Sequence, residues 1–218
     1  MTIRSSCKNK AHLTAVLLSG LALFSASAAE ARDNKYVWKM TTLNQTYHIN
    51  FNNPADCDAN TIDGATIWNP ASRFKANYGP MFSGNIVRNT AGVQISFEPA
   101  ANMVNGAGTP AEAPPGSSSG TVVIDSKTLT KVSDADIRIN ADHWVQGYMR
   151  CGETTPPATA SQFDFGRFIA HEMGHVVGVD DVSVNVNCLT YYQMQYQIPL
   201  TAPCSTEAAF AVRLNGAP

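Results

Sequence analysis

Two histidines, a glutamate and two aspartates lie close together in the run FDFGRFIAHEMGHVVGVDD, which extends from Phe163 to Asp181. His171 and His175 are four positions apart, and residues i and i+4 of an α-helix lie on the same face. Their imidazoles can therefore point at a common ion. Zinc binds imidazole nitrogen well, and a catalytic zinc takes three protein ligands and leaves one position for water. The spacing predicts a zinc site on a helix.

The residues around the two histidines fit the same chemistry. Glu172 follows the first histidine, where a carboxylate can take a proton from zinc-bound water. Gly178 can adopt the left-handed conformation that ends a helix, and the turn after it brings Asp180 or Asp181 towards the metal. The alternative is a buried helix whose two histidines are merely hydrogen-bonded. Helical spacing, glycine and a ligand-type residue occur together, which favours the metal site.

The run resembles the zinc-binding consensus of the metzincin metallopeptidases, HExxHxxGxx followed by His or Asp. Counting from His171, the resemblance implies the metal ligands His171, His175 and Asp181, with Asp180 as the other candidate for the third position. Most metzincins have histidine there, whereas the snapalysins have aspartate. The segments ADIRIN and FIAHEMGHVVGV are more similar to the matrixin branch. The chain therefore resembles a matrixin-like metzincin with a snapalysin-like third ligand.

This resemblance implies an α+β fold with a metzincin-like mixed twisted sheet, an active-site helix and a C-terminal helix. It also implies a secreted zinc-dependent endopeptidase in which Glu172 is the general base for a zinc-activated water. The segment Gln193–Tyr196 is similar to the methionine turn of these enzymes, with Met194 packed below the imidazoles. Tyr196 then stabilises the transition-state oxyanion, or it is a core or surface tyrosine, and both interpretations stay open.

A second class of protein fits the same ligands, namely a secreted binding or adhesion protein with a structural zinc and no peptidase activity. Glu172 separates the two classes, because a structural site has no use for a carboxylate beside an open coordination position. Glu207 could be a distant third ligand, as in the gluzincin class, but Gly178 and Asp181 already fit the nearer arrangement. His143 is disfavoured as a ligand because the motif completes the set without it.

Residues 1–31 have the features of a secretory signal peptide. Three basic residues precede the apolar run Ala15–Phe24, and small residues follow it. The run is too short to span a bilayer comfortably, so we expect no membrane anchor. With 44% hydrophobic residues in a chain of 218, residues 32–218 are long enough for one catalytic domain. We also expect a monomer, in the periplasm or outside the cell.

The cysteine content indicates disulfides, and the charge distribution limits the classes of binding partner. Once the signal peptide and its Cys7 are removed, four cysteines remain, which suggests two disulfides in an exported chain. The sequence leaves three pairings open, and we favour Cys188 with Cys204, which leaves Cys57 with Cys151. The formal charge is −2 with no basic stripe or block, which argues against nucleic acid or an anionic membrane as partner. A protein or peptide substrate is expected.

Hydrophobic periodicity predicts the elements that hold the site. We expect strands at residues 47–51, 93–97, 121–125 and 135–140, a turn at 127–134 and an N-terminal edge segment at 35–40. Residues 105–120, rich in Gly, Pro and Ser, are expected to form a long exposed loop. The resemblance puts the ADIRIN strand close to the cleft, whose open edge pairs with extended substrate.

Three helices are expected. The first covers residues 57–71, with Trp68 and Phe74 in the core. The active-site helix begins at an Asp164 cap, and Gly174 within it lets another segment approach closely. The last helix begins at Ser205 or Thr206 and docks beneath the sheet through Ala209, Phe210, Val212 and Leu214. His48 is expected to be a surface or half-buried strand residue.

Overall fold

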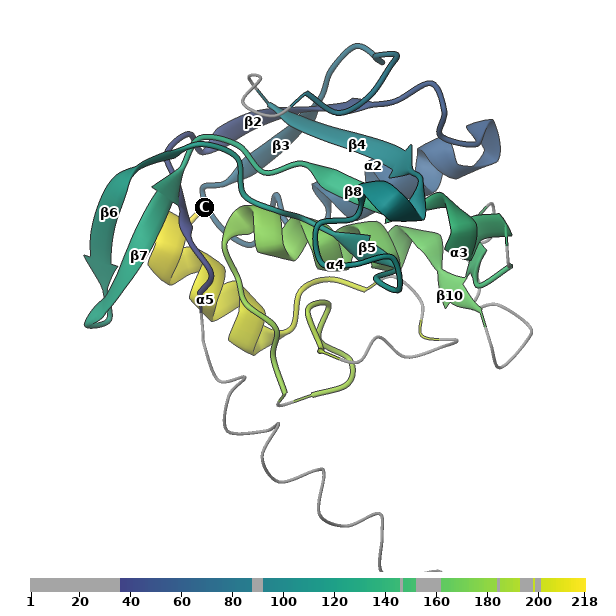
Figure 1. Ribbon diagram of the computed structural model, residues 1–218. Coiled ribbons are helices and arrows are strands. Elements are labelled where there is room, and N and C mark those ends of the chain that lie inside the picture. The colour runs from purple at the N-terminus through teal and green to yellow at the C-terminus, as the bar shows by residue number, and fades with distance from the viewer. Residues whose placement is uncertain are drawn as a thin grey trace, which may run out of the picture. The chain divides into compact units, whose positions relative to one another are not determined.

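Three sheets and four α-helices make up the described part of the chain in a computed structural model (Figure 1). The structure describes residues 36–87, 92–145, 147–151, 162–183, 185–192, 198 and 201–218, with the side chain of Val145 left out. The mixed α and β composition and the C-terminal helix are as expected. The predicted signal peptide over residues 1–31 lies outside the described residues.

A five-stranded sheet carries most of the core, and its strand order is β3-β2-β4-β8-β5. The first four strands are parallel to their neighbours, whereas β5 is antiparallel to β8, with Ala111 opposite Ile139. The expected strands at 47–51, 93–97 and 135–140 are confirmed. The bounds are β2 Asn44–Ile49, β3 Lys75–Tyr78, β4 Val93–Glu98, β5 Ala111–Glu112 and β8 Ile137–Asn140.

The expectation of an exposed loop over residues 105–120 is wrong in part. Strand β5 lies within this stretch, and both Ala111 and Glu112 are buried. Two residues between prolines are too few for alternation to reveal a strand, because the sequence signal needs at least four. The open edge of the sheet belongs to β5, while β8, which carries most of ADIRIN, is paired on both sides.

A hairpin replaces the turn expected at residues 127–134. Strands β6 (Ser118–Ile124) and β7 (Lys127–Val132) pair antiparallel, with Ile124 opposite Lys127. Asp125 and Ser126 both have positive φ, 49° and 65°, as a two-residue hairpin turn requires. Strand β1 (Lys39–Met40) pairs in parallel with β7 and forms an edge of the order β1-β7-β6, which confirms the N-terminal segment as an edge.

Helix α2 (Asp58–Thr66) packs directly against helix α4 (Phe165–Val177). A Cβ on Gly64 would lie 2.3 Å from the carbonyl oxygen of Gly166, so only glycine allows this separation. Trp68 is fully buried and donates its indole N–H to the Ala170 carbonyl at 2.8 Å. Phe74 is fully buried as well. The expected first helix and its two core aromatics are therefore confirmed, with the helix shorter than predicted.

Two disulfides and several short elements complete the described fold. Cys57 is bonded to Cys151 and Cys188 to Cys204, which confirms both favoured pairings. Disulfides of this kind indicate an oxidising compartment. The remaining short elements are the 3₁₀ turns η1 Ala55–Cys57 and η2 Ala100–Asn102, helix α3 Ala141–Val145, and the parallel pair β9 Met149–Arg150 and β10 Phe163–Asp164.

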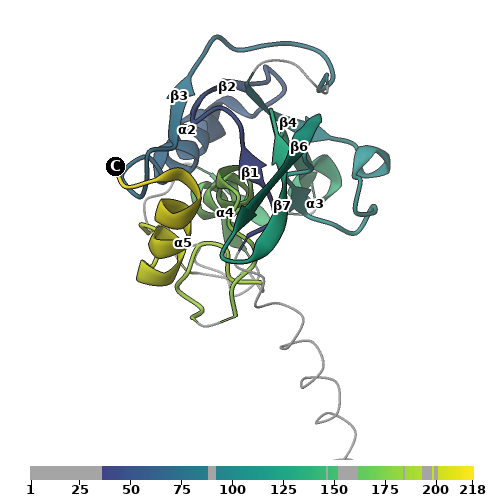
Figure 2. The same ribbon diagram turned by 90° about the vertical axis from the view of Figure 1, so that its left-hand side faces the viewer.

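Helix α5 (Ser205–Asn215) lies beside the N-terminal segment and the end of α4 (Figure 2). Its N-cap is Cys204, and not Ser205 or Thr206, because Glu207 accepts the Cys204 backbone N–H in a capping box. The Asn215 side chain donates to the Val177 carbonyl at 3.2 Å and accepts from Lys39 at 2.7 Å. The buried apolar residues are Ala211 and Leu214, whereas Ala209 is exposed, contrary to expectation.

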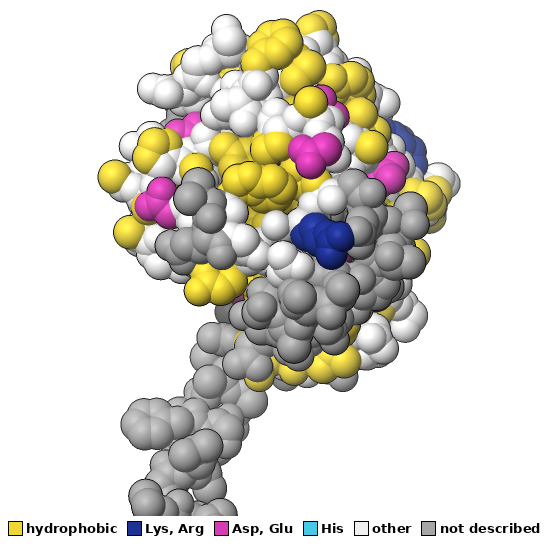
Figure 3. Space-filling view, turned by 90° about the vertical axis from the view of Figure 1, so that its right-hand side faces the viewer, with side chains coloured by type: hydrophobic (Ala, Val, Ile, Leu, Met, Phe, Trp, Pro, Cys, Tyr) yellow, Lys and Arg dark blue, Asp and Glu magenta, His cyan; other side chains and the backbone are white. Residues whose placement is uncertain are grey.

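The face of the molecule that carries α3 and β10 has hydrophobic side chains at its centre, with acidic side chains around them (Figure 3). Basic side chains of the described residues form no continuous stripe on this face. None of the described helices has the length and apolar content needed to cross a membrane. The expectation that nucleic acid is not a partner stays a prediction.

Replacing Gly64 with alanine is expected to lower the free energy of unfolding by roughly 1–2 kcal/mol, because the new methyl group would collide with backbone of α4. Helix propensity alone predicts the opposite sign, a gain of roughly 1 kcal/mol. Urea denaturation of both proteins measures the difference. Gly108→Ala is the matched control, since nothing lies within 4 Å of its added Cβ. A Gly64→Ala variant as stable as the control would contradict the close helix packing.

Candidate metal centre

Helix α4 holds two of the candidate ligands and has well-defined ends. Asp164 caps its first turn by accepting the Arg167 backbone N–H at 2.7 Å, as expected. Gly178 ends the helix in the left-handed conformation, with φ 102°. The apolar side chains expected on its inner face are all buried: Phe168, Ile169, Met173, Val176 and Val177.

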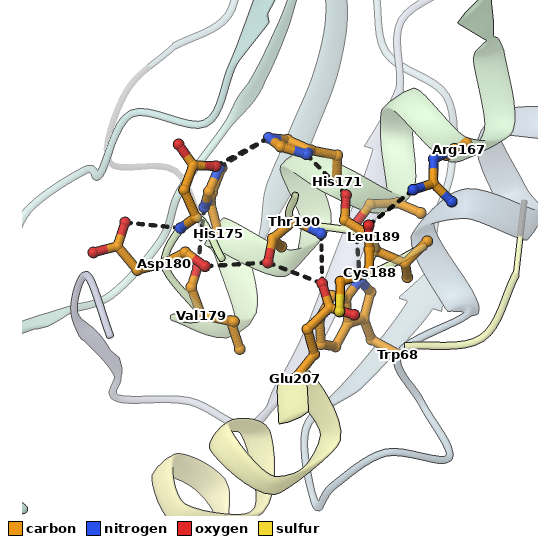
Figure 4. Close-up of polar contacts among 12 residues, drawn as sticks. Trp68, Arg167, His171, His175, Val179, Asp180, Cys188, Leu189, Thr190 and Glu207 are labelled. Atoms are coloured by element: carbon orange, nitrogen blue, oxygen red, sulfur yellow. Dashed lines mark hydrogen bonds and ion pairs between the residues drawn. The ribbon is translucent and has the colours of Figure 1, made fainter. Parts of the chain in front are cut away.

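Ligand atoms of His171, His175 and Asp181 converge on one point. Figure 4 shows the two imidazoles facing one another. The two Nε2 atoms lie 3.2 Å apart, and each lies 3.5 Å from Oδ1 of Asp181. His171 and His175 come from successive turns of α4, as their spacing predicts. Asp181 comes from the chain that returns after Gly178.

Backbone carbonyls determine the tautomer of both neutral imidazoles. Nδ1 of His171 lies 2.9 Å from the Leu189 carbonyl oxygen, and Nδ1 of His175 lies 2.9 Å from that of Val179. A carbonyl only accepts, so each Nδ1 carries the proton and each Nε2 presents a lone pair. Oδ1 of Asp181 is buried without a hydrogen-bond partner among the described residues. With both imidazoles neutral, three lone pairs face one another, an arrangement that suits a cation.

The dimensions of this triangle suit zinc. Ligand atoms bonded at about 2.0–2.1 Å to a tetrahedral zinc lie roughly 3.3–3.4 Å apart. The separations among His171, His175 and Asp181 are 3.2, 3.5 and 3.5 Å. Two imidazoles and one carboxylate are also a ligand set that zinc accepts in catalytic sites. The residues present thus fit the ion that the sequence predicts.

Burial shifts the pKa values of His171 and Glu172 on α4. It lowers the pKa of His171 to about 3, and the neighbouring His175 lowers it further, so this imidazole is neutral and able to bind metal near pH 7. Burial likewise raises the pKa of Glu172 to about 7, with His175 acting in the opposite direction. A carboxylate with such a pKa can both accept and release a proton near neutral pH.

Asp180 has a supporting place beside Asp181. Its Oδ1 accepts the Asp181 backbone N–H at 2.9 Å, and its carbonyl oxygen lies 3.1 Å from the Thr190 hydroxyl. Its carboxylate points away from the two imidazoles (Figure 4). Burial raises the pKa of Asp180 above its usual value. The geometry therefore favours Asp181 over Asp180 as the third ligand.

A pocket of about 640 Å³ opens at these residues. Glu172 lines it together with the three candidate ligands. Strand β5 and the following Pro114 form part of its wall, and Val104, Phe163 and Phe168 add apolar surface. A carboxylate beside the ligand triangle and an apolar cleft in front of it are thus present in one cavity.

Gly174 permits close packing behind the ligands, as the sequence suggested. A Cβ at this position would lie 2.3 Å from the Thr190 methyl carbon and 2.7 Å from the Trp68 ring. The segment that contains Thr190 also provides the Leu189 carbonyl that accepts from His171. The helix glycine therefore lets this segment reach the imidazole.

Other candidates lie elsewhere or outside the described residues. Met194 and Tyr196 belong to residues 193–197, which the structure does not describe, so their predicted roles stay predictions. His143 packs against the Tyr148 ring, with centroids 5.7 Å apart. The half-buried His48 lies on β2 with Nδ1 2.7 Å from the Pro80 carbonyl oxygen.

Glu207 binds Thr190 and Cys204, and does not join the histidines. The two carbonyls that orient the imidazoles were not predicted from the sequence. Arg167, which is buried at the start of α4, was not predicted either. Backbone carbonyls carry no sequence signal of their own, but a lone arginine within an otherwise apolar helix face was a signal that could have been noticed.

The chain matches no protein-family model and no curated protein. Its function is therefore inferred from the side chains of the site.

Asp181→Ala is expected to lower zinc affinity by more than the ~10–100-fold typical of changes to outer partners, because it removes a direct ligand. Asp180→Ala is expected to lower it by at most about tenfold, since only a supporting hydrogen bond is lost. Zinc content after dialysis against buffer of defined free zinc distinguishes the two variants. Equal zinc content would remove Asp181 from the ligand set.

Proposed function

We propose that the chain is a zinc-dependent endopeptidase of the metzincin type, matrixin-like with an aspartate as third ligand. The observation that carries this proposal is the meeting of three proton-free ligand atoms beside Glu172 in an open pocket. Support for the type comes from the sequence run itself, the left-handed Gly178 that returns the chain, and a mixed sheet above the active-site helix.

Glu172 is the acid–base group of the proposed reaction. When bound, a zinc ion lowers the pKa of its water and polarises the scissile carbonyl. The Glu172 carboxylate accepts a proton from the attacking water and delivers it to the leaving nitrogen of the peptide bond. Burial matters here, because in the metal-free site it raises the pKa of Glu172 and so favours proton uptake by this carboxylate. The backbone carbonyls of Leu189 and Val179 hold the Nδ1 atoms of His171 and His175, which orients both rings with Nε2 towards the metal position.

Strand β5 is the proposed binding edge for substrate. It ends the five-stranded sheet and lines the pocket, and its outer side is not covered by a described strand. An extended peptide can add to such an edge through main-chain hydrogen bonds alone, which suits cleavage of varied protein sequences. The apolar wall formed by Val104, Phe163 and Phe168 favours a hydrophobic side chain near the cleaved bond.

A structural zinc in a binding or adhesion protein is the competing interpretation. Structural zinc sites are closed by four protein ligands, whereas three ligand atoms converge among the described residues. The carboxylate of Glu172 and the neighbouring pocket have no part in a purely structural site. An exported peptidase is also consistent with the two disulfides, because these are typical of proteins that work outside the reducing cytosol.

Glu172→Gln is expected to reduce hydrolysis of casein at least 10²–10⁴-fold, the range typical of a lost general acid–base group. Zinc content should stay at the wild-type level, because Glu172 is not one of the converging ligands. Caseinolysis with and without a chelator, measured beside metal analysis, checks both parts.

Activity of the Glu172→Gln variant equal to the wild type would exclude Glu172 as the base. A wild-type protein that binds zinc in equal proportion but cleaves neither casein nor unfolded proteins would favour the structural-zinc class instead.

A further inference from the structure

We propose that Arg167 and Glu207 form a clamp that positions His171 for metal binding, by fixing the segment Val186–Thr190 from two sides. The inference rests on the proposed metal centre, since it assigns a purpose to residues outside the ligand set. Figure 4 shows the arrangement, with Arg167 on α4, Glu207 on α5 and the clamped segment between them.

The clamped segment needs such support because it has no regular structure of its own. Residues 186–190 form successive turns outside any helix or strand. Yet the Leu189 carbonyl within it receives the Nδ1 proton of His171 at 2.9 Å. The partner of a ligating imidazole sets its tautomer and its ring orientation. Motion of this carbonyl would therefore change the orientation of the His171 ring directly.

Arg167 fixes the first half of the segment. It stands one helical turn before His171, so both side chains leave α4 on the same face and reach the same segment. One guanidinium nitrogen donates to the Val186 carbonyl at 3.0 Å and to the Cys188 carbonyl at 2.8 Å. The side chain is 1% exposed. Arginine suits this task because its planar guanidinium fixes the directions of the two N–H groups of that nitrogen.

Glu207 fixes the second half. Its Oε1 accepts the Thr190 backbone N–H at 2.5 Å and lies 2.9 Å from the Thr190 hydroxyl. Its Oε2 accepts the Cys204 backbone N–H at 2.8 Å. The carboxylate is fully buried, and the Cys188–Cys204 disulfide ties the same two stretches covalently. The carbonyl of Leu189 is thus held between the Arg167 contacts on one side and the Glu207 contacts on the other.

Two buried charges are an unfavourable way to stabilise a fold. Removing ionic side chains from water carries a large desolvation penalty, and apolar residues of similar volume often stabilise as well or better. Fixed geometry is what two multiply hydrogen-bonded polar side chains supply and apolar packing does not. The nearby feature that requires a fixed geometry is the metal ligand His171, whose imidazole is oriented by the Leu189 carbonyl of the clamped segment.

The first test uses the metal-free protein and needs no activity. The Nδ1 proton of His171 is followed by NMR of the imidazole, and its exchange with solvent is measured in wild type, Arg167→Lys and Glu207→Gln. Lysine keeps the charge but loses the planar guanidinium and its fixed N–H directions, and glutamine replaces one acceptor oxygen with a donor. Exchange is expected to be about tenfold faster or more in both variants, because the acceptor carbonyl is no longer held.

Asn50→Ala is the matched control. Asn50 is also buried and also binds a loop, through the Gly84 carbonyl at 2.5 Å and the Ser96 hydroxyl at 3.0 Å, but it follows β2 directly and is not part of the metal centre. Exchange of the His171 proton is expected to be unchanged in this variant even if its urea midpoint falls as far as those of the clamp variants. Equal acceleration in all three variants would show a general loss of stability and overturn the clamp.

The second test measures zinc affinity by competition with a chelator. Arg167→Lys and Glu207→Gln are expected to bind zinc about tenfold more weakly than wild type, and Asn50→Ala to bind it equally well. Arg167→Met, which removes the charge, is expected to bind more weakly than Arg167→Lys. If Arg167→Met fails to fold, Arg167→Lys alone decides.

The clamp and the peptidase can fail separately. A protein that binds zinc and shows these shifts, yet cleaves no peptide, would refute the peptidase and keep the clamp. An active peptidase in which Arg167→Lys and Glu207→Gln leave both the His171 proton and the zinc affinity unchanged would refute the clamp and keep the peptidase.

Discussion

The site depends on two hydrogen bonds from imidazoles to backbone carbonyls. By holding the Nδ1 protons of His171 and His175, the carbonyls of Leu189 and Val179 leave both Nε2 lone pairs facing the carboxylate of Asp181. Such an arrangement repels itself unless a positive ion occupies its centre. Metal binding and correct folding of the two carbonyl-bearing segments are consequently coupled, so that each favours the other.

The remaining fold serves to keep these segments against α4. Two glycines let other parts of the chain reach the helix, Gly64 towards α2 and Gly174 towards Thr190 and Trp68. Each disulfide holds the start of one helix: Cys57 directly precedes α2, and Cys204 directly precedes α5. The chain thus packs closely around helix α4 at defined positions. This helix carries two of the candidate ligands and the proposed base.

Much of the site could be predicted from the sequence because its signals are local. The spacing of His171 and His175, the left-handed Gly178 and the Asp164 cap follow from helix geometry alone. Strand β5 could not be predicted, since two buried residues carry no periodicity. The hairpin at Asp125 was missed because its turn residues lack the glycine that usually marks a two-residue turn.

The residues just before β1 support the metal centre through a contact with the turn after α4. Tyr36 forms an antiparallel bridge with Val179, and the Val37 backbone N–H donates to the Gly178 carbonyl at 3.0 Å. The Val179 carbonyl is the one that accepts from His175. Tyr36 and Val37 therefore brace the second imidazole from behind. Cutting the chain after Tyr36 would loosen that brace, so an intact backbone at this point helps to determine how firmly an ion is held.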